Sequence, residues 1–266
     1  MPLAVCATPI GNLEDVTLRV LAELREAAVV LAEDTRHTRG LLERHGIRAK
    51  LLSYHEHNEA ARVAELLPRL AAGERIALVS DAGMPGVSDP GARLVRAALD
   101  AGIEVTVLPG PSAVETALVA SGLTGGRYAF VGFLPRKAAE LVALWRETAA
   151  WECPVVAFES PHRLSAALSS LAAFDPEREV AVCRELTKRF EEVVRGTAAE
   201  LAARLTEPPK GEVTLVVGAG TAATDPEQAR QAVADLVTAG TPRGVAAEVV
   251  ARLTDTSRND LYRGSL

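Results

Sequence analysis

Short apolar runs alternate along the chain with Ala- and Leu-rich stretches that have a helical period. Strands are predicted at residues 3–8, 29–33, 75–80 and 104–108, and again at 128–133, 154–159, 179–184 and 212–217. Helices are predicted at residues 17–27, 59–72, 137–148, 162–173 and 198–205. The second of these helices carries its apolar positions on one face, at Val63, Leu66, Leu67 and Leu70. Strands that alternate with helices are typical of an α/β fold.

The glycine-rich loop at residues 122–126 is the strongest candidate for a domain boundary. It separates an N-terminal α/β domain (1–121) from a C-terminal α/β domain (122–220), and a small helical module follows at 221–266. In this module, Asp225-Pro226 marks the start of a helix. A later helix is expected to present one apolar face, formed by Val245, Val249 and Leu253.

The composition is that of an ordinary globular protein, with 48% hydrophobic and 24% charged residues. The net charge of -6 gives no support to nucleic-acid binding, although a total charge does not show where basic residues gather. Cys6, Cys153 and Cys183 lie far apart in apolar segments, which favours reduced thiols over a disulfide or a metal site. No apolar run is long enough to cross a bilayer, and the start of the chain lacks the layout of a secretory signal. We therefore expect a cytoplasmic protein with no metal and no membrane partner.

Three loops rich in Gly and Pro follow predicted strands, at residues 7–12, 80–91 and 109–113. They lie at the carboxyl edge of the predicted sheet, where open α/β folds bind ligands. Capping explains part of them: Asp89-Pro90 reads as a helix start, and Ser112 with Glu115 reads as a capping box. Capping does not explain the stretch from Asp81 to Pro85, which favours a ligand-binding loop.

Charged side chains follow two strands of the second half. Residues 159–163 read Glu-Ser-Pro-His-Arg, and residues 184–192 form a charged run directly after an apolar strand. Such runs are often solvated loops, but their place at the ligand edge favours a functional site. We expect the two segments to converge on one wall of a cleft. The sequence has neither the phosphate-binding loop of nucleotide triphosphatases nor a paired-cysteine or HExxH metal motif.

Taken together and in this order, these loops resemble the tetrapyrrole methylase superfamily and, within it, the ribosomal RNA small subunit methyltransferase I family. The resemblance covers nearly the whole chain, through residues 8–17, 32–38, 80–91, 109–112, 132–135, 159–163, 184–192 and 211–217. It implies two α/β domains with a cofactor cleft between them, S-adenosylmethionine as the cofactor, and a homodimer. It also implies methylation of a cytidine 2′-hydroxyl in the decoding region of 16S ribosomal RNA within the small ribosomal subunit.

The resemblance also implies which residues contact the cofactor. These are Ile10, Met84, Val87, Ser112, Ala113, Phe158, Leu186 and Glu212. Met84 and Gly86 stand where the family usually has threonine and a larger apolar residue, which matters little if the backbone holds the cofactor.

Catalysis of this kind needs alignment of the reacting atoms, and a base to accept the proton of a weakly nucleophilic hydroxyl. Candidate bases are Glu159, Glu185, Asp81 and, if its pKa is lowered, Lys188, whereas Arg184 or Lys188 can instead hold phosphates beside the target ribose. Two other functions remain open from the residues: methylation of a tetrapyrrole carbon, and RNA binding without catalysis.

Overall fold

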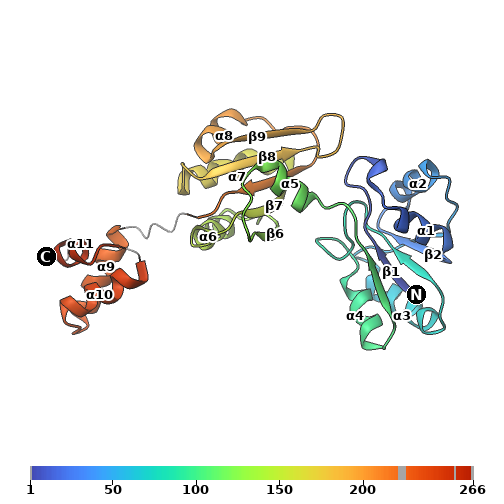
Figure 1. Ribbon diagram of the computed structural model, residues 1–266, viewed down its shortest axis with the longest axis horizontal. Helices are drawn as coiled ribbons and strands as arrows, with labels where there is room; N and C mark the ends of the chain where they lie inside the picture. The colour runs from blue at the N-terminus through green and yellow to red at the C-terminus, as the bar shows by residue number, and fades with distance from the viewer. Residues whose placement is uncertain (1, 221–225, 255, 265–266) are drawn as a thin grey trace.

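The computed structural model describes residues 2–220, 226–254 and 256–264. Figure 1 shows two sheets, each with its own helices, followed by a group of three helices at the C-terminal end. Asp225, expected at the start of the first of these helices, lies outside the described residues. Within the described ranges, no helix has both the length and the apolar character that crossing a membrane requires.

The first sheet is wholly parallel, with the strand order β3-β2-β4-β1-β5. Its strands are β1 (Leu3–Cys6), β2 (Val29–Ala32), β3 (Leu51–Ser53), β4 (Ile76–Leu78) and β5 (Val105–Leu108). The helices are α1 (Leu18–Glu26), α2 (Thr35–Arg44), α3 (Glu59–Ala71) and α4 (Ala92–Asp100), with a 3-10 turn, η1, at Leu13–Asp15. Residues of α1 and α2 share one core with the sheet, and residues of α3 and α4 share another. Both faces of the sheet are thus covered, which accounts for its fully apolar central strands.

The second sheet has the order β6-β7-β10-β8-β9 and is mixed. Its strands are β6 (Ala129–Phe133), β7 (Val155–Glu159), β8 (Glu179–Arg184), β9 (Glu192–Thr197) and β10 (Val213–Val217). The helices are α5 (Ala113–Ser121), α6 (Ala138–Ala149), α7 (Pro161–Phe174) and α8 (Ala198–Arg204). Strand β10 pairs antiparallel with both β7 and β8, so β7 and β8 run in the same direction and end at the same edge.

Helix α5 packs against the second sheet, although it precedes the loop at residues 122–126. Val114, Ala117 and Leu118 share an apolar cluster with β7, β8 and β10, while α6, α7 and α8 supply the core on the other face. The domain boundary at residue 121 stays a prediction. By its packing, α5 belongs with the strands that follow it.

The C-terminal helices are α9 (Pro226–Thr238), α10 (Arg243–Thr254) and α11 (Arg258–Gly264). They enclose a small core of their own, made by Ala229, Val233, Ala246, Ala247, Val250 and Leu261. The expected apolar face of α10 is wrong, since Val245 is 50% and Leu253 is 74% exposed. Small alanine side chains let the three helices approach closely, and this turns a different face of α10 inward.

Candidate functional site

The Gly/Pro loops of the first domain meet at the carboxyl edge of its sheet. Thr8 and Gly83 exchange backbone hydrogen bonds of 2.9 and 3.0 Å, and the Thr8 hydroxyl donates to the Ser80 carbonyl at 3.0 Å. Gly83 has a φ of +72°, and a Cβ there would lie 3.9 Å from both Ile10 Cγ2 and the Pro111 carbonyl oxygen. All three loops therefore surround one point of the structure.

Asp89 does not begin a helix, contrary to the sequence-based expectation. Helix α4 starts at Ala92, and its N-cap is Gly91, whose φ of 142° suits glycine. Asp89 is instead partly buried near two other carboxylates. Burial, together with the negative charges of Glu33 and Asp81, raises the pKa of Asp89 to about 7.

Ser112 is the N-cap of α5, but the expected capping box is wrong. Its hydroxyl donates to the Glu115 carboxylate, which also accepts a 2.5 Å hydrogen bond from the Tyr128 hydroxyl, and no side-chain cap bond forms. Since the serine does not cap, the N–H groups of Ala113 and Val114 at the start of α5 are left for another acceptor. Such a helix start attracts carboxylates.

An apolar cluster joins the two domains beside these loops. Four of the residues expected at the cofactor lie in or against it: Ile10, Ala113, Phe158 and Leu186. Ser112 precedes Ala113 directly. Met84 packs against the core of the first domain and Val87 is exposed, so their side chains lie outside this cluster. Glu212 also lies outside it, in a polar network.

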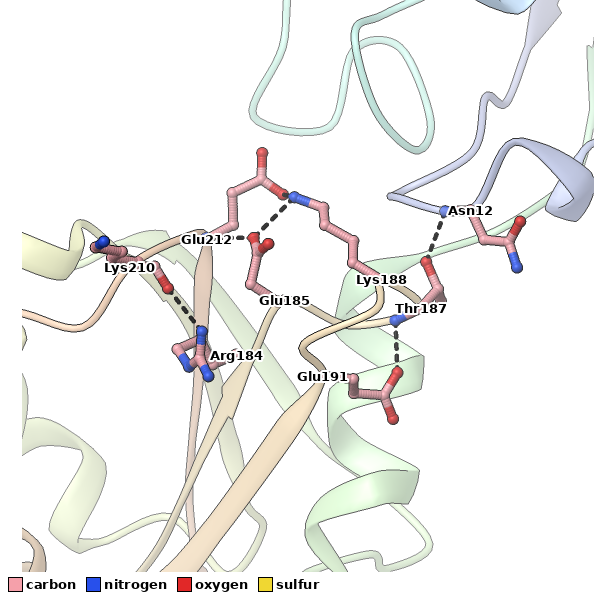
Figure 2. A network of polar contacts seen from close by, with 8 residues as sticks. All are labelled: Asn12, Arg184, Glu185, Thr187, Lys188, Glu191, Lys210 and Glu212. Carbon is pink, nitrogen blue, oxygen red and sulfur yellow. Dashed lines mark hydrogen bonds and ion pairs between the residues drawn. The ribbon is translucent and has the colours of Figure 1, made fainter. Parts of the chain in front are cut away.

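Figure 2 shows that network, which is centred on Lys188. The Lys188 Nζ lies 2.9 Å from both Glu185 Oε1 and Glu212 Oε2, and the Glu212 N–H donates to Glu185 Oε1 at 3.0 Å. The Lys188 hydrogen bonds lower the pKa of Glu185. Partial burial lowers the pKa of Lys188, but pairing with Glu212 and Glu185 outweighs this effect, so the pKa is raised. Lys188 therefore stays protonated at neutral pH. It was a candidate base only if its pKa was lowered, so it does not meet that condition.

The backbone of this segment is held in an uncommon conformation. Glu185 and Thr187 have φ values of 51° and 65°, which non-glycine residues seldom adopt. A Cβ at Gly211 would collide with the Glu185 side chain, so glycine lets the start of β10 approach it. Strain of this kind persists where the surrounding contacts fix it, and it gathers at functional sites.

Glu159 and Arg184 flank the network at the same sheet edge. Both pair in register with Val213 on β10, so the ends of β7 and β8 lie at the same sheet edge, on either side of β10. The buried Glu159 carboxylate accepts the Ser160 N–H at 2.6 Å and pairs with Arg163. Burial raises the pKa of Glu159 in spite of these contacts. Arg184 contacts Glu192 on β9 and donates to the Lys210 carbonyl at 2.9 Å.

The charged loop after β8 also contacts the first domain. The Asn12 N–H donates to the Thr187 hydroxyl at 3.0 Å (Figure 2). A Cβ at Gly11 would lie 2.8 Å from both the Leu186 carbonyl oxygen and Thr187 Oγ1, so only glycine permits this approach. An open cavity of about 620 Å³ adjoins the contact, lined by Gly11, Asn12, Leu13, Glu14, Arg44, Thr187, Lys188 and Arg189.

Sequence reasoning did not select several of these residues for the site. Asn12 and Thr187 lie in segments that it did select, but their contact joins two domains and leaves no local signal. Arg44 lies at the end of α2, outside the quoted motifs, and only the packing of α2 brings it to the cavity.

The chain has one parallel and one mixed sheet, and its loops converge on an apolar cluster that both domains share, beside a charged wall. This arrangement is that of a two-domain α/β enzyme of the methylase type. The chain belongs to the family Tetrapyrrole (Corrin/Porphyrin) Methylases, whose profile matches residues 2–202. Within this family it groups with proteins called Ribosomal RNA small subunit methyltransferase I. The protein of that name from Synechocystis is 43% identical over 99% of this chain and 97% of its own length. The one from Mesorhizobium japonicum is 43% identical over 98% and 90%, respectively.

A solved structure shares the fold. The uroporphyrin-III-C-methyltransferase from Thermus thermophilus has a TM-score of 0.57 and 26% identity, and the match covers 81% of this chain and 93% of that one. The expected arrangement of two α/β domains followed by C-terminal helices is confirmed.

Proposed function

We propose that this protein transfers the methyl group of S-adenosylmethionine to the 2′-hydroxyl of a cytidine in the decoding region of 16S ribosomal RNA. The observation that carries the proposal is the similarity to ribosomal RNA small subunit methyltransferase I, which extends over 99% of the chain. The solved uroporphyrin-III-C-methyltransferase, which shares the fold, is more distant, at 26% identity.

The residues present fit S-adenosylmethionine. The uncapped start of α5 after Ser112 suits a carboxylate, and the apolar cluster at Ile10, Ala113 and Phe158 suits the flat adenosine group. Leu186 closes the cluster from the second domain. The bound cofactor supplies an activated methyl group on a sulfonium. Ser112, Ile10, Ala113, Phe158 and Leu186 would hold it, by side chain or backbone.

Lys188 and Glu185 are our candidates for the residues that act on the ribose. The Lys188 ammonium, held in place by two carboxylates, would stabilise the negative charge that develops on the 2′-oxygen as its proton leaves. Glu185 accepts the proton. Because its pKa is lowered, it is a weak base, and alignment of the reacting atoms must supply most of the acceleration.

Glu159 and Arg184 act as positioning residues in this proposal. The Glu159 carboxylate is buried and engaged by Ser160 and Arg163, so it fixes the start of α7. Arg184 ties the end of β8 to β9 and to Lys210, which holds the strained segment that carries Glu185.

Transfer of a labelled methyl group tests the proposal. Small ribosomal subunits from a strain that lacks the enzyme are incubated with radiolabelled S-adenosylmethionine, beside naked RNA and a uroporphyrinogen-type tetrapyrrole. We expect label in the 2′-O-methylcytidine of the subunits. Labelled tetrapyrrole with unlabelled subunits would refute the RNA substrate. Failure to bind the cofactor in calorimetry, with no methylation of any acceptor, would favour an RNA-binding protein without catalysis.

The same assay tests the role of Lys188. Lys188→Met keeps the length of the side chain but removes its charge, so we expect turnover to fall by about 100-fold. Cofactor affinity, measured by calorimetry, should not change, and Lys188→Arg should restore part of the rate. Wild-type turnover in Lys188→Met would remove this residue from the chemistry.

The proposal extends to assembly and location. A homodimer is supported by Val87 and Phe133, two exposed apolar side chains on neighbouring segments, since a Cβ at Gly132 would lie 3.8 Å from Ser88 Oγ. The proposed substrate places the enzyme in the cytoplasm, where small ribosomal subunits are assembled.

A further inference from the structure

Helix α2 and the residues after it form a basic surface on an acidic protein. Between residues 35 and 50 the chain has five Arg or Lys residues and one Glu, whereas its net charge is -6. All five basic side chains are exposed: Arg36, Arg39, Arg44, Arg48 and Lys50. A concentration of positive charge on one short segment is the usual footprint of a polyanion site.

This surface leads into the cavity between the domains. Arg44, at the end of α2, lines the cavity together with Lys188 and Arg189 from the second domain. Arg44 pairs with Glu14 at 2.5 Å, but both side chains are more than half exposed, so the pair can open at little cost. The basic surface and the proposed catalytic lysine therefore border the same space.

An exposed aromatic ring lies beside the cavity. Phe190 is 65% exposed, and the guanidinium of Arg189 is 5.5 Å from the centre of its ring. A positive group next to an open aromatic face is the combination that binds single-stranded nucleic acid, because the cation contacts phosphate while a base stacks on the ring.

Several of these cations are not neutralised by the protein. Among the ion pairs of the described residues, none involves Arg39, Arg48 or Arg189. Nearby carboxylates are engaged elsewhere: Glu191 accepts the Thr187 N–H at 2.5 Å, and Glu192 pairs with Arg184. The surface is thus complementary to a negatively charged chain.

We propose that α2, Arg189 and Phe190 bind the single-stranded RNA that flanks the target nucleotide. Arg39, Arg48 and Arg189 hold its phosphates, and Phe190 stacks on one unpaired base. The inference rests on the proposed function and adds to it a route by which RNA reaches Lys188.

The test uses full-length protein, small ribosomal subunits and a fluorescent single-stranded oligoribonucleotide. We expect the double variant Arg39→Ala/Arg48→Ala to raise KM for subunits about tenfold, and to reduce by about one to two the slope of log affinity against log salt. Phe190→Ala should weaken oligonucleotide binding by about tenfold, and Phe190→Trp should restore it. The kcat and the calorimetric cofactor affinity should stay near wild type.

Arg96→Ala is the matched control, because Arg96 is also an exposed arginine and lies on α4, at the opposite end of the first domain from α2 (Figure 1). It should leave KM and the salt slope unchanged. If the wild-type enzyme is active, an unchanged KM and salt slope in Arg39→Ala/Arg48→Ala, together with unchanged oligonucleotide binding in Phe190→Ala, would overturn the RNA surface alone. The RNA surface would also be overturned if the variants lost affinity for an acidic peptide or for anionic vesicles but kept their affinity for RNA. Wild-type protein that binds cofactor but methylates no subunits would refute the proposed function itself.

Discussion

At the scale of single residues, buried carboxylates set the pH response. Asp89 has a pKa of about 7 in the folded protein, against an ordinary value of 3.8, since burial and the charges of Glu33 and Asp81 oppose its ionisation. Below pH 4 the group is protonated in both the folded and the unfolded state. As the pH rises from 4 to 7, only the unfolded state loses the proton freely, so stability decreases across this window and stays reduced above pH 7.

Asp89→Asn removes the buried charge and should therefore stabilise the protein at pH 8. A gain of about 1 kcal/mol corresponds to a rise in Tm of roughly 2–4 °C for a chain of this size. The advantage over wild type should shrink at pH 5, because there wild-type Asp89 is already protonated when folded. Thermal melts at both pH values check this, with exposed Asp100→Asn as the control. An equal or larger advantage at pH 5 would contradict the assignment.

At the scale of elements, the loop after β1 and the loop after β8 control how the domains meet. Gly11→Ala would place a methyl group 2.8 Å from the Leu186 carbonyl oxygen, and the backbone there cannot yield as a flexible side chain does. We expect the loops to separate by a fraction of an ångström and kcat/KM to fall on the order of 100-fold, because misplacement of reacting groups is costly.

The Tm of Gly11→Ala should change little, because each domain keeps its own core. Gly126→Ala is the control, since a Cβ at Gly126 meets no atom within 4 Å. Kinetics on small subunits beside thermal melts give the comparison. Full activity in Gly11→Ala would show that the close approach is not needed.

The sequence pattern predicts most elements to within one or two residues, and the exceptions have physical causes. Strand β3 has only three residues, all half-buried, and β9 is largely polar, so neither shows an apolar run. Helix α2 was not predicted because it buries only Thr38, Leu41 and Leu42. In the site, the position of Glu159 and Arg184 at one sheet edge follows from the direction of their strands. Arg44 and the contact between Asn12 and Thr187 depend on how the two domains pack, which no local pattern records.

At the scale of the whole molecule, the proposed dimer can be tested at the edge of the second sheet. Phe133, on edge strand β6, is 60% exposed, so burial in a partner would explain a large apolar side chain there. Phe133→Asp should shift the protein from dimer to monomer in sedimentation experiments at micromolar concentration. Phe174→Asp, at an exposed position at the end of α7, is the control. A dimer that survives Phe133→Asp would place the interface elsewhere.

The order in which the chain is synthesised decides when each sheet can be completed. The first sheet is complete once residue 108 has been made, so the first domain can fold early on the ribosome. In the second sheet, β10 lies between β7 and β8 but is the last strand to be made. Until residues 213–217 emerge, β7 can pair only with β6, and β8 only with β9, so the two halves of the sheet are not joined. The same strand brings Glu212 to Lys188. A nascent chain thus acquires its proposed catalytic network in the same step that closes its second core, and an incompletely translated protein has neither.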